Sequence, residues 1–117
     1  MNIFLSLALL LVSGLTLADE PDIPTQLKTH YFDAARRGDV EMLDTFIASH
    51  YPLDVQDDKG YTALILAAYN GQGKTVEQLL NAGANACVQD KRGNTALMGA
   101  IFKGELKIAR RLLATDC

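Results

Sequence analysis

Residues 60–90, GYTALILAAYNGQGKTVEQLLNAGANACVQD, form one complete unit of an internal repeat. Gly60 recurs 33 positions later as Gly93, and Thr62 recurs as Thr95. Three further registers also include the preceding unit: Ala34, Ala67 and Ala100; Gly38, Gly71 and Gly104; and the apolar pairs 46–47, 79–80 and 112–113. A fixed period of this size predicts stacked supersecondary units, none of which can bury its apolar face alone.

Each unit is predicted to contain two helices. The hydroxyl of Thr62 can cap the first helix by accepting a hydrogen bond from a free backbone N–H. Gly71 can end that helix, because glycine adopts a positive φ at little cost. Apolar residues spaced for one buried stripe then predict the second helix: Val76, Leu79 and Leu80 in the complete unit. Gly83 is expected to stop it, and the polar residues 85–94 predict an exposed loop.

The motif Gly-x-Thr-x-Leu-x-x-Ala-Ala-x-x-Gly, followed by Val-x-x-Leu-Leu-x-x-Gly-Ala, resembles the ankyrin repeat. The resemblance covers residues 27–117 and implies an all-α solenoid of about three helix–turn–helix units, at about 27–56, 57–89 and 90–117. In this family, projecting hairpin tips and the first helices form a concave surface that binds proteins. With the N-terminal segment described below, the chain resembles a small exported bacterial ankyrin-repeat protein.

Two units depart from the family's Thr-Pro-Leu-His sequence. Residues 62–65 read Thr-Ala-Leu-Ile, and residues 95–98 read Thr-Ala-Leu-Met. The missing proline removes a pre-set helical φ, and the missing histidine removes inter-repeat hydrogen bonds that the family implies. We expect apolar packing by Ile65 and Met98 to offset part of this loss. The first unit has His-Tyr-Pro at 50–52 where the family has Gly-Ala-Asp, which suits an N-terminal cap.

The third unit stops at Cys117, where the family would continue into a loop and a capping repeat. Four apolar residues are therefore expected to lack a covering unit: Leu106, Ile108, Leu112 and Leu113. We expect a C-terminally truncated member with low stability and a tendency to self-associate, because about three repeats lie near the minimum for a stable array.

The N-terminal residues predict export. An apolar run at 3–12 is followed by the small residues Thr16 and Ala18, which suit cleavage by signal peptidase after residue 18. The run is shorter than the roughly 20 apolar residues of a membrane anchor, although its start has no Lys or Arg. We expect a signal peptide at 1–18, a linker at 19–26, a periplasmic or secreted location, and no membrane association after cleavage.

The composition argues against nucleic acid as a partner, because the net charge is −3 and no basic footprint is present. The segment GQGKT at 71–75 looks like a phosphate loop. However, the glycine needed five residues before the second one is Ala68, and a helix is predicted where a strand should precede. We interpret 71–73 as the turn between two helices, with Lys74 and Thr75 starting the second helix.

No other motif predicts catalysis or a cofactor. Asp54, Asp57 and Asp58 lack the spacing of a calcium loop. Asp57 and Asp90 match the aspartate that opens each family repeat, which implies a structural role. His30 and His50 occupy non-equivalent registers without a neighbour at metal-ligand spacing. We therefore expect a protein that is not an enzyme and that has no catalytic, cofactor or metal site.

Cys87 and Cys117 are the only cysteines, and they are 30 residues apart. Position 120, beyond the last residue, would be in register with Cys87. The two are therefore expected to lie near one another without being aligned. Export permits a disulfide, but bridging needs Cα atoms within about 7 Å. Free thiols are the preferred interpretation, and the disulfide remains open.

Carrying the family's concave-surface positions across gives twelve candidate protein-binding residues: Arg36, Arg37, Asp58, Lys59, Tyr61, Tyr69, Asn70, Lys91, Arg92, Asn94, Phe102 and Lys103. Tyr, Phe and Arg are the side chains that most often anchor protein interfaces. We expect Tyr61, Tyr69 and Phe102 to serve as anchors, and the cations to set the partner's orientation. The alternative is a set of solvated loops without a partner.

The expected function is binding of an unidentified partner protein in the periplasm. Similar exported proteins imply support of an oxidative-stress enzyme. The alternatives are an immunity-type inhibitor of a periplasmic toxin and a truncated, non-functional fragment. An enzyme or ligand-binding protein that uses residues 73–75 or the aspartates belongs to another class, which a ligand-induced rise in melting temperature would favour.

Overall fold

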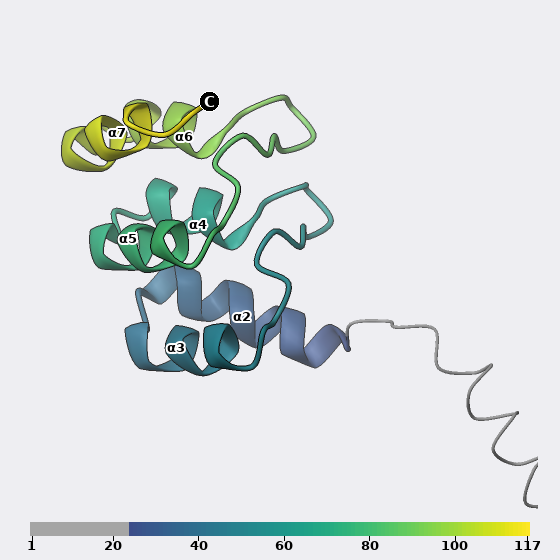
Figure 1. The fold of residues 1–117 in the computed structure, drawn as a ribbon. Coiled ribbons are helices and arrows are strands. Elements are labelled where there is room, and N and C mark those ends of the chain that lie inside the picture. The colour runs from purple at the N-terminus through teal and green to yellow at the C-terminus, as the bar shows by residue number, and fades with distance from the viewer. Residues whose placement is uncertain (1–23) are drawn as a thin grey trace, which may run out of the picture.

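The computed structural model describes residues 24–117, which form six helices and no strand. The helices are α2 (Thr25–Arg37), α3 (Val40–Ala48), α4 (Ala63–Tyr69), α5 (Gly73–Asn81), α6 (Ala96–Phe102) and α7 (Leu106–Leu113). Consecutive helices pair, and the three pairs stack as layers, with the connecting hairpin loops projecting from one side (Figure 1). The predicted all-α solenoid is confirmed, whereas the predicted signal peptide and linker residues 19–23 lie outside the described residues.

The first helices α2, α4 and α6 stack directly on one another. Ala34, Ala67 and Ala100 recur on these helices and are completely buried, so small side chains stand where the helices meet. The predicted caps are confirmed, because the hydroxyls of Thr62 and Thr95 accept hydrogen bonds from the N–H groups of Ile65 and Met98. The period of the sequence therefore sets both the start and the packing of these helices.

The second helices α3, α5 and α7 bury one stripe each and are joined across layers by polar side chains. Leu43, Val76, Leu79 and Leu112 face the core. Gln78 Nε2 donates to Asp44 Oδ1, and Arg111 Nε donates to Glu77 Oε2, at 2.5 and 2.6 Å. These two contacts are one repeat apart and link neighbouring layers. They supply inter-repeat hydrogen bonds that the missing histidines do not make.

The two hairpins have the same turn, built around Asp57 and Asp90. Oδ1 of Asp57 accepts from the N–H groups of Lys59 and Tyr61, each at 2.9 Å. Asp90 makes the equivalent pair of bonds 33 residues later. A Cβ on Gly60 would lie 2.7 Å from the backbone nitrogen of Lys91. The aspartates therefore have the structural role that the resemblance implied, and Gly60 allows one hairpin to lie against the next.

The core of the first helix pair contains a cluster of aromatic side chains. Tyr31 is fully buried and lies against Phe32, Phe46 and Tyr51, with ring centroids 4.7–5.7 Å apart. Its hydroxyl donates to the Leu53 carbonyl at 2.8 Å, and burial raises the pKa of Tyr31 above its ordinary value. Helix α2 starts at Thr25, with Pro24 at its N-cap, so the last two residues of the predicted linker belong to the helix.

The third pair is closed by a disulfide between Cys87 and Cys117, whose Cα atoms are 5.3 Å apart. The preference for free thiols was therefore wrong, because the chain after α7 ends beside the start of the preceding hairpin. The expectation for the apolar residues was only half right. Leu106 and Leu113 are 67% and 66% exposed, but Ile108 and Leu112 face inward and are buried against the preceding layer.

His50 occupies the register of Gly83 and has the same left-handed backbone conformation. Its φ is 57°, compared with 100° at Gly83, and it is the one described non-glycine residue with positive φ. Gly83 follows the second helix of its unit, as predicted. Side chains other than glycine strain this conformation by roughly 1–2 kcal/mol, so the repeat geometry here overrides local preference.

Candidate functional site

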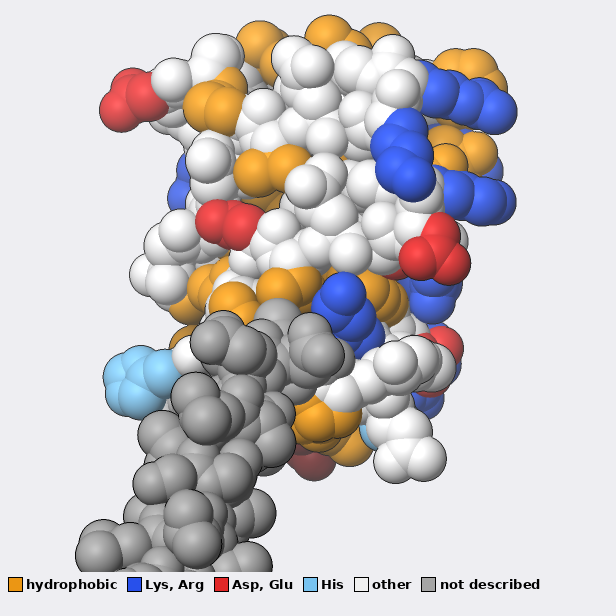
Figure 2. All heavy atoms as spheres, turned by 90° about the vertical axis from the view of Figure 1, so that its right-hand side faces the viewer, with side chains coloured by type: hydrophobic (Ala, Val, Ile, Leu, Met, Phe, Trp, Pro, Cys, Tyr) orange, Lys and Arg blue, Asp and Glu red, His pale blue; other side chains and the backbone are white. Residues whose placement is uncertain are grey.

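A groove of about 630 Å³ lies between the hairpins and the first helices. Its lining comes from α2, α4 and α6 and from both hairpins: Arg36, Tyr61, Ile65, Leu66, Tyr69, Asn70, Asp90, Arg92, Asn94, Thr95, Met98, Gly99 and Phe102. Figure 2 shows the hairpin side of the molecule, where Lys and Arg side chains gather toward one edge beside hydrophobic ones. The described part of the chain thus has a groove that combines apolar and cationic side chains.

Tyr69 and Phe102 form the aromatic part of the groove. Each is the last residue of its helix, α4 or α6, and the two are one repeat apart. The stacked helices therefore place the rings parallel, with centroids 6.3 Å apart and planes 10° apart. Tyr69 is 41% exposed and Phe102 is 78% exposed. Large apolar surface of this kind, left open in a groove, is typical of a binding site.

Two neighbouring residues shape the surroundings of this aromatic pair. Lys103 Nζ lies 4.9 Å from the centre of the Tyr69 ring, a cation–π contact that holds the ammonium at the rim of the groove. Gly99 stands in the register of Leu66, and a Cβ there would lie 3.8 Å from Tyr69 Cδ2. Because Gly99 has no side chain, the groove stays open beside the tyrosine.

The hairpin wall of the groove is held rigid from within. Asp90 Oδ1 binds the backbone N–H groups of Arg92 and Asn94, both at 2.9 Å. These bonds fix the turn from which the two side chains project. Tyr61 is half-buried and packs against the core from the first hairpin. The wall therefore presents polar side chains from an ordered loop.

The structure gathers seven of the twelve predicted residues around the groove: Arg36, Tyr61, Tyr69, Asn70, Arg92, Asn94 and Phe102. Lys103 joins them through its contact with Tyr69. Arg37 is directed elsewhere, since it pairs with Asp33 at 2.9 Å and with Asp39 at 3.7 Å. Asp58, Lys59 and Lys91 are exposed outside the lining. Whether the gathered residues bind a partner remains a prediction.

Sequence reasoning missed Met98 as a groove residue. We expected Met98 to pack like Ile65, but Met98 is 48% exposed and lines the groove, whereas Ile65 is 5% exposed. Helix α6 of the third layer packs on α4, whereas among the described residues no further layer packs on α6. Ile65, Asp90 and Thr95 were also omitted, because their repeat registers indicated structural roles, and Leu66 and Gly99 were not singled out in the sequence.

The sequence that looks like a phosphate loop is a turn between helices, as interpreted. Gly71 follows α4 with a φ of 73°, and Gly73 begins α5. The Thr75 side chain is fully buried. His30 and His50 lie on the first layer only, and residues 24–117 contain no group of three or more His, Cys, Asp or Glu that could hold a metal ion.

In a comparison with protein families, residues 31–117 match a model described as ankyrin repeats (3 copies). A comparison with curated proteins finds no match to this chain. In the described part of the chain, none of the helices has the length and apolar character needed to cross a membrane.

Proposed function

The chain belongs to the ankyrin-repeat family, and from this premise we propose that it is a non-catalytic periplasmic module that binds a partner protein through the groove. Ankyrin repeats are generally protein–protein interaction modules. The observation that carries the proposal is the exposed, stacked pair of Tyr69 and Phe102. Exposed aromatic anchors surrounded by polar groups are the usual centres of protein interfaces.

The proposed location rests on the N-terminal sequence and on the disulfide. Residues 1–18 have the composition of a signal peptide, and the Cys87–Cys117 bond is of the kind that persists in oxidising compartments such as the periplasm. Cell fractionation with N-terminal sequencing tests this. We expect a periplasmic protein that begins at Asp19, whereas an uncleaved cytosolic chain would contradict the proposed export.

The binding proposal is tested by pull-down from a periplasmic extract. We expect Tyr69→Ala combined with Phe102→Ala to abolish recovery of the partner while leaving the helical circular dichroism signal unchanged. The matched control is Leu106→Ala with Leu113→Ala, which removes two exposed apolar side chains outside the groove. Unchanged recovery with the groove variant, or equal loss with the control, would contradict binding through the groove.

The partner's identity decides between the two specific roles. The favoured role is support of an oxidative-stress enzyme, and the alternative is inhibition of a periplasmic toxin. Adding the purified chain to the captured partner separates them. Enzyme support predicts retained or increased partner activity, whereas toxin inhibition predicts its loss at equimolar ratio. A captured partner that is neither an oxidative-stress enzyme nor a toxin would contradict both specific roles and leave the general binding role.

A further inference from the structure

We infer that the groove selects an acidic partner segment, in which carboxylates flank a large apolar or aromatic residue. The inference rests on the proposed binding function and specifies the chemistry of its partner. It starts from the charges at the groove. Arg36 and Arg92 line it, and Lys103 lies over the Tyr69 ring at its rim. The chain as a whole has a net charge of −3, so the groove has the opposite sign to the protein.

The three groove cations (Arg36, Arg92 and Lys103) have no carboxylate within ion-pair distance among residues 24–117, unlike Arg37 and Arg111 elsewhere. Six cations outside the groove are also unpaired among these residues, so what distinguishes the three is that they surround one groove whose lining has a single carboxylate. Three cations left without a counter-charge around one groove produce a positive field there, which steers and orients an acidic ligand.

The one acidic residue in the groove lining, Asp90, offsets one of the three positive charges and leaves two. Asp90 Oδ1 already accepts two backbone hydrogen bonds inside its turn. The remaining polar lining residues, Asn70, Asn94 and Thr95, are neutral. A ligand thus meets cations at the ends of the first helices and on the hairpin, with apolar surface between them.

The apolar surface specifies the other half of the ligand. Tyr69 and Phe102 offer stacked rings, and Met98 adds a flexible thioether beside them. Such a surface favours Phe, Tyr, Trp or Leu in the bound segment. Nucleic acid fits less well, because binding through phosphates uses many cationic contacts and the net charge of this protein is negative.

The experiment is selection from a displayed library of random dodecamer peptides on the purified, oxidised chain. We expect enriched peptides to carry Asp or Glu on both sides of an aromatic residue or Leu. A synthetic consensus peptide is then titrated against variants by fluorescence anisotropy. The triple variant Arg36→Glu, Arg92→Glu and Lys103→Glu is expected to bind this peptide at least about tenfold more weakly. Selection on this variant should favour basic peptides.

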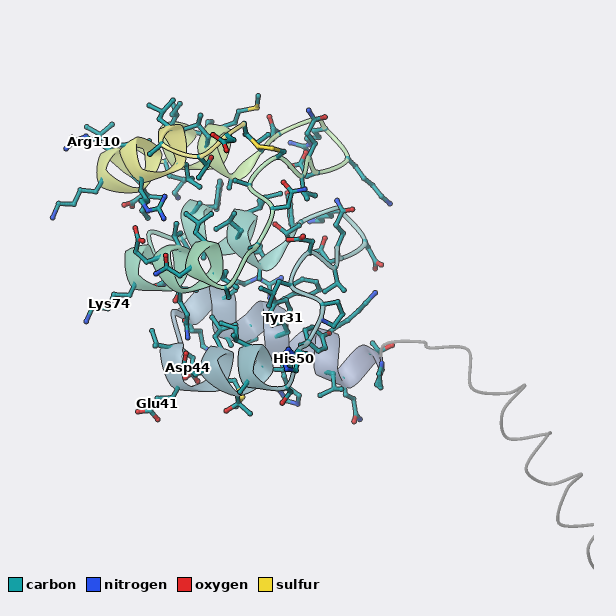
Figure 3. The ribbon with its side chains drawn as sticks, in the orientation of Figure 1. Tyr31, Glu41, Asp44, His50, Lys74 and Arg110 are labelled. Atoms are coloured by element: carbon teal, nitrogen blue, oxygen red, sulfur yellow. A yellow bond between two sulfur atoms is a disulfide. The ribbon has the colours of Figure 1, made fainter. Side chains whose placement is uncertain are left out.

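The matched control reverses three exposed cations away from the groove: Lys74→Glu, Lys107→Glu and Arg110→Glu. Lys74 and Arg110 point away from the hairpin side of the molecule (Figure 3). The control changes the net charge by the same amount, and we expect it to lower the affinity for the peptide less than about threefold. Equal weakening in both variants would show that only net charge matters, and it would overturn the inference.

A second measurement uses the wild-type chain, so it does not depend on the folding of any variant. Binding of the acidic peptide should weaken steadily as salt is raised from 50 to 500 mM, as expected for ion pairs at a solvent-exposed rim. Salt-independent binding would contradict the inference. A dodecameric oligothymidylate should not displace the peptide, and displacement would instead assign the groove to nucleic acid.

The outcomes separate this inference from the binding function on which it rests. Enrichment of neutral or basic peptides whose binding depends on Tyr69 and Phe102 would overturn the acidic preference and leave the groove as a binding site. Peptides that bind Tyr69→Ala with Phe102→Ala as well as the wild type would overturn the groove itself, and both proposals with it.

Discussion

The first and third helix pairs have the same length of repeat but are stabilised by different chemistry. In the first pair, α2 and α3 enclose Tyr31 among aromatic rings. In the third, α6 and α7 have seven and eight residues, and a disulfide ties their end to the preceding hairpin. Among residues 24–117, each of these two pairs packs against one other layer, and the aromatic contacts and the disulfide add stability that the middle pair obtains from packing on both sides.

Burial in the first pair and crosslinking in the third therefore substitute for one another in this fold. The first pair buries Tyr31, Phe32 and Phe46, and apolar burial contributes roughly 25 cal/mol per Å². The third pair leaves Ile101, Leu106 and Leu113 largely exposed, but its disulfide restricts the unfolded chain. Changes at three places in the molecule test this difference.

The largest effect is expected from Tyr31→Ala, which empties the centre of the aromatic cluster. Removal of a buried aromatic side chain costs about 3–5 kcal/mol, a large share of the stability of a domain this small. Urea unfolding followed by circular dichroism measures it. A loss below about 1 kcal/mol would mean that the cluster contributes little to holding the first pair.

Tyr31→Phe is the matched control, because it keeps the ring and removes only the hydrogen bond to the Leu53 carbonyl. We expect a loss of about 1 kcal/mol. Alkaline titration adds a second readout. Because burial raises the pKa of Tyr31 in the folded state, the unfolded state loses this proton first, at a pH of about 10. Stability should therefore fall as the pH rises above about 10, and less steeply in Tyr31→Phe.

The second prediction breaks the third pair. Reducing the disulfide, or replacing Cys87 and Cys117 with serine, should cost about 3–4 kcal/mol by the loop-entropy relation for a 30-residue separation. Hydrogen exchange should show the loss first in α6 and α7, since the rest of the array keeps its packing. Equal loss of protection in α2 and α3 would contradict independent stabilisation of the two ends.

The smallest effect is expected at a position where the first and second units differ in backbone chemistry. His50 and Gly83 share a register and a positive φ. His50→Gly should remove strain and stabilise the protein by about 0.5 kcal/mol after the entropic cost of glycine. Gly83→His should destabilise it by about 1 kcal/mol, and thermal melts measure both. A stabilising Gly83→His would show that the left-handed conformation is not what distinguishes these positions.

Most of the fold could be predicted from the sequence because the repeat encodes it locally. Thr62 and Thr95 cap helices, Gly71 and Gly83 follow them, and the apolar stripes lie inward. The disulfide could not be predicted from register alone. Cys117 is three positions short of the register of Cys87, and the path of the chain after α7 decides whether it comes within bonding distance.

The candidate groove was predictable only in part, for a related reason. Repeat registers placed Tyr69 and Phe102 on one surface, and the structure stacks them. Registers also made Met98 look like Ile65, although Met98 is on the last layer and is half exposed. The sequence does not distinguish Arg37 from Arg36, but in the structure Arg37 pairs with two carboxylates. Neighbours from other layers, which sequence periodicity does not report, decide these cases.

The Cys87–Cys117 disulfide also determines how the molecule would lengthen under mechanical tension. A force applied between the ends of the repeat array passes through the two sulfur atoms and bypasses the chain between them. An extended chain spans about 3.3–3.6 Å per residue. The 30-residue segment between the cysteines therefore cannot extend while the disulfide is intact, which shortens the fully extended chain by roughly 100 Å. Tension on the oxidised protein would therefore pull out α2 to α5, while α6 and α7 stay within a closed covalent ring.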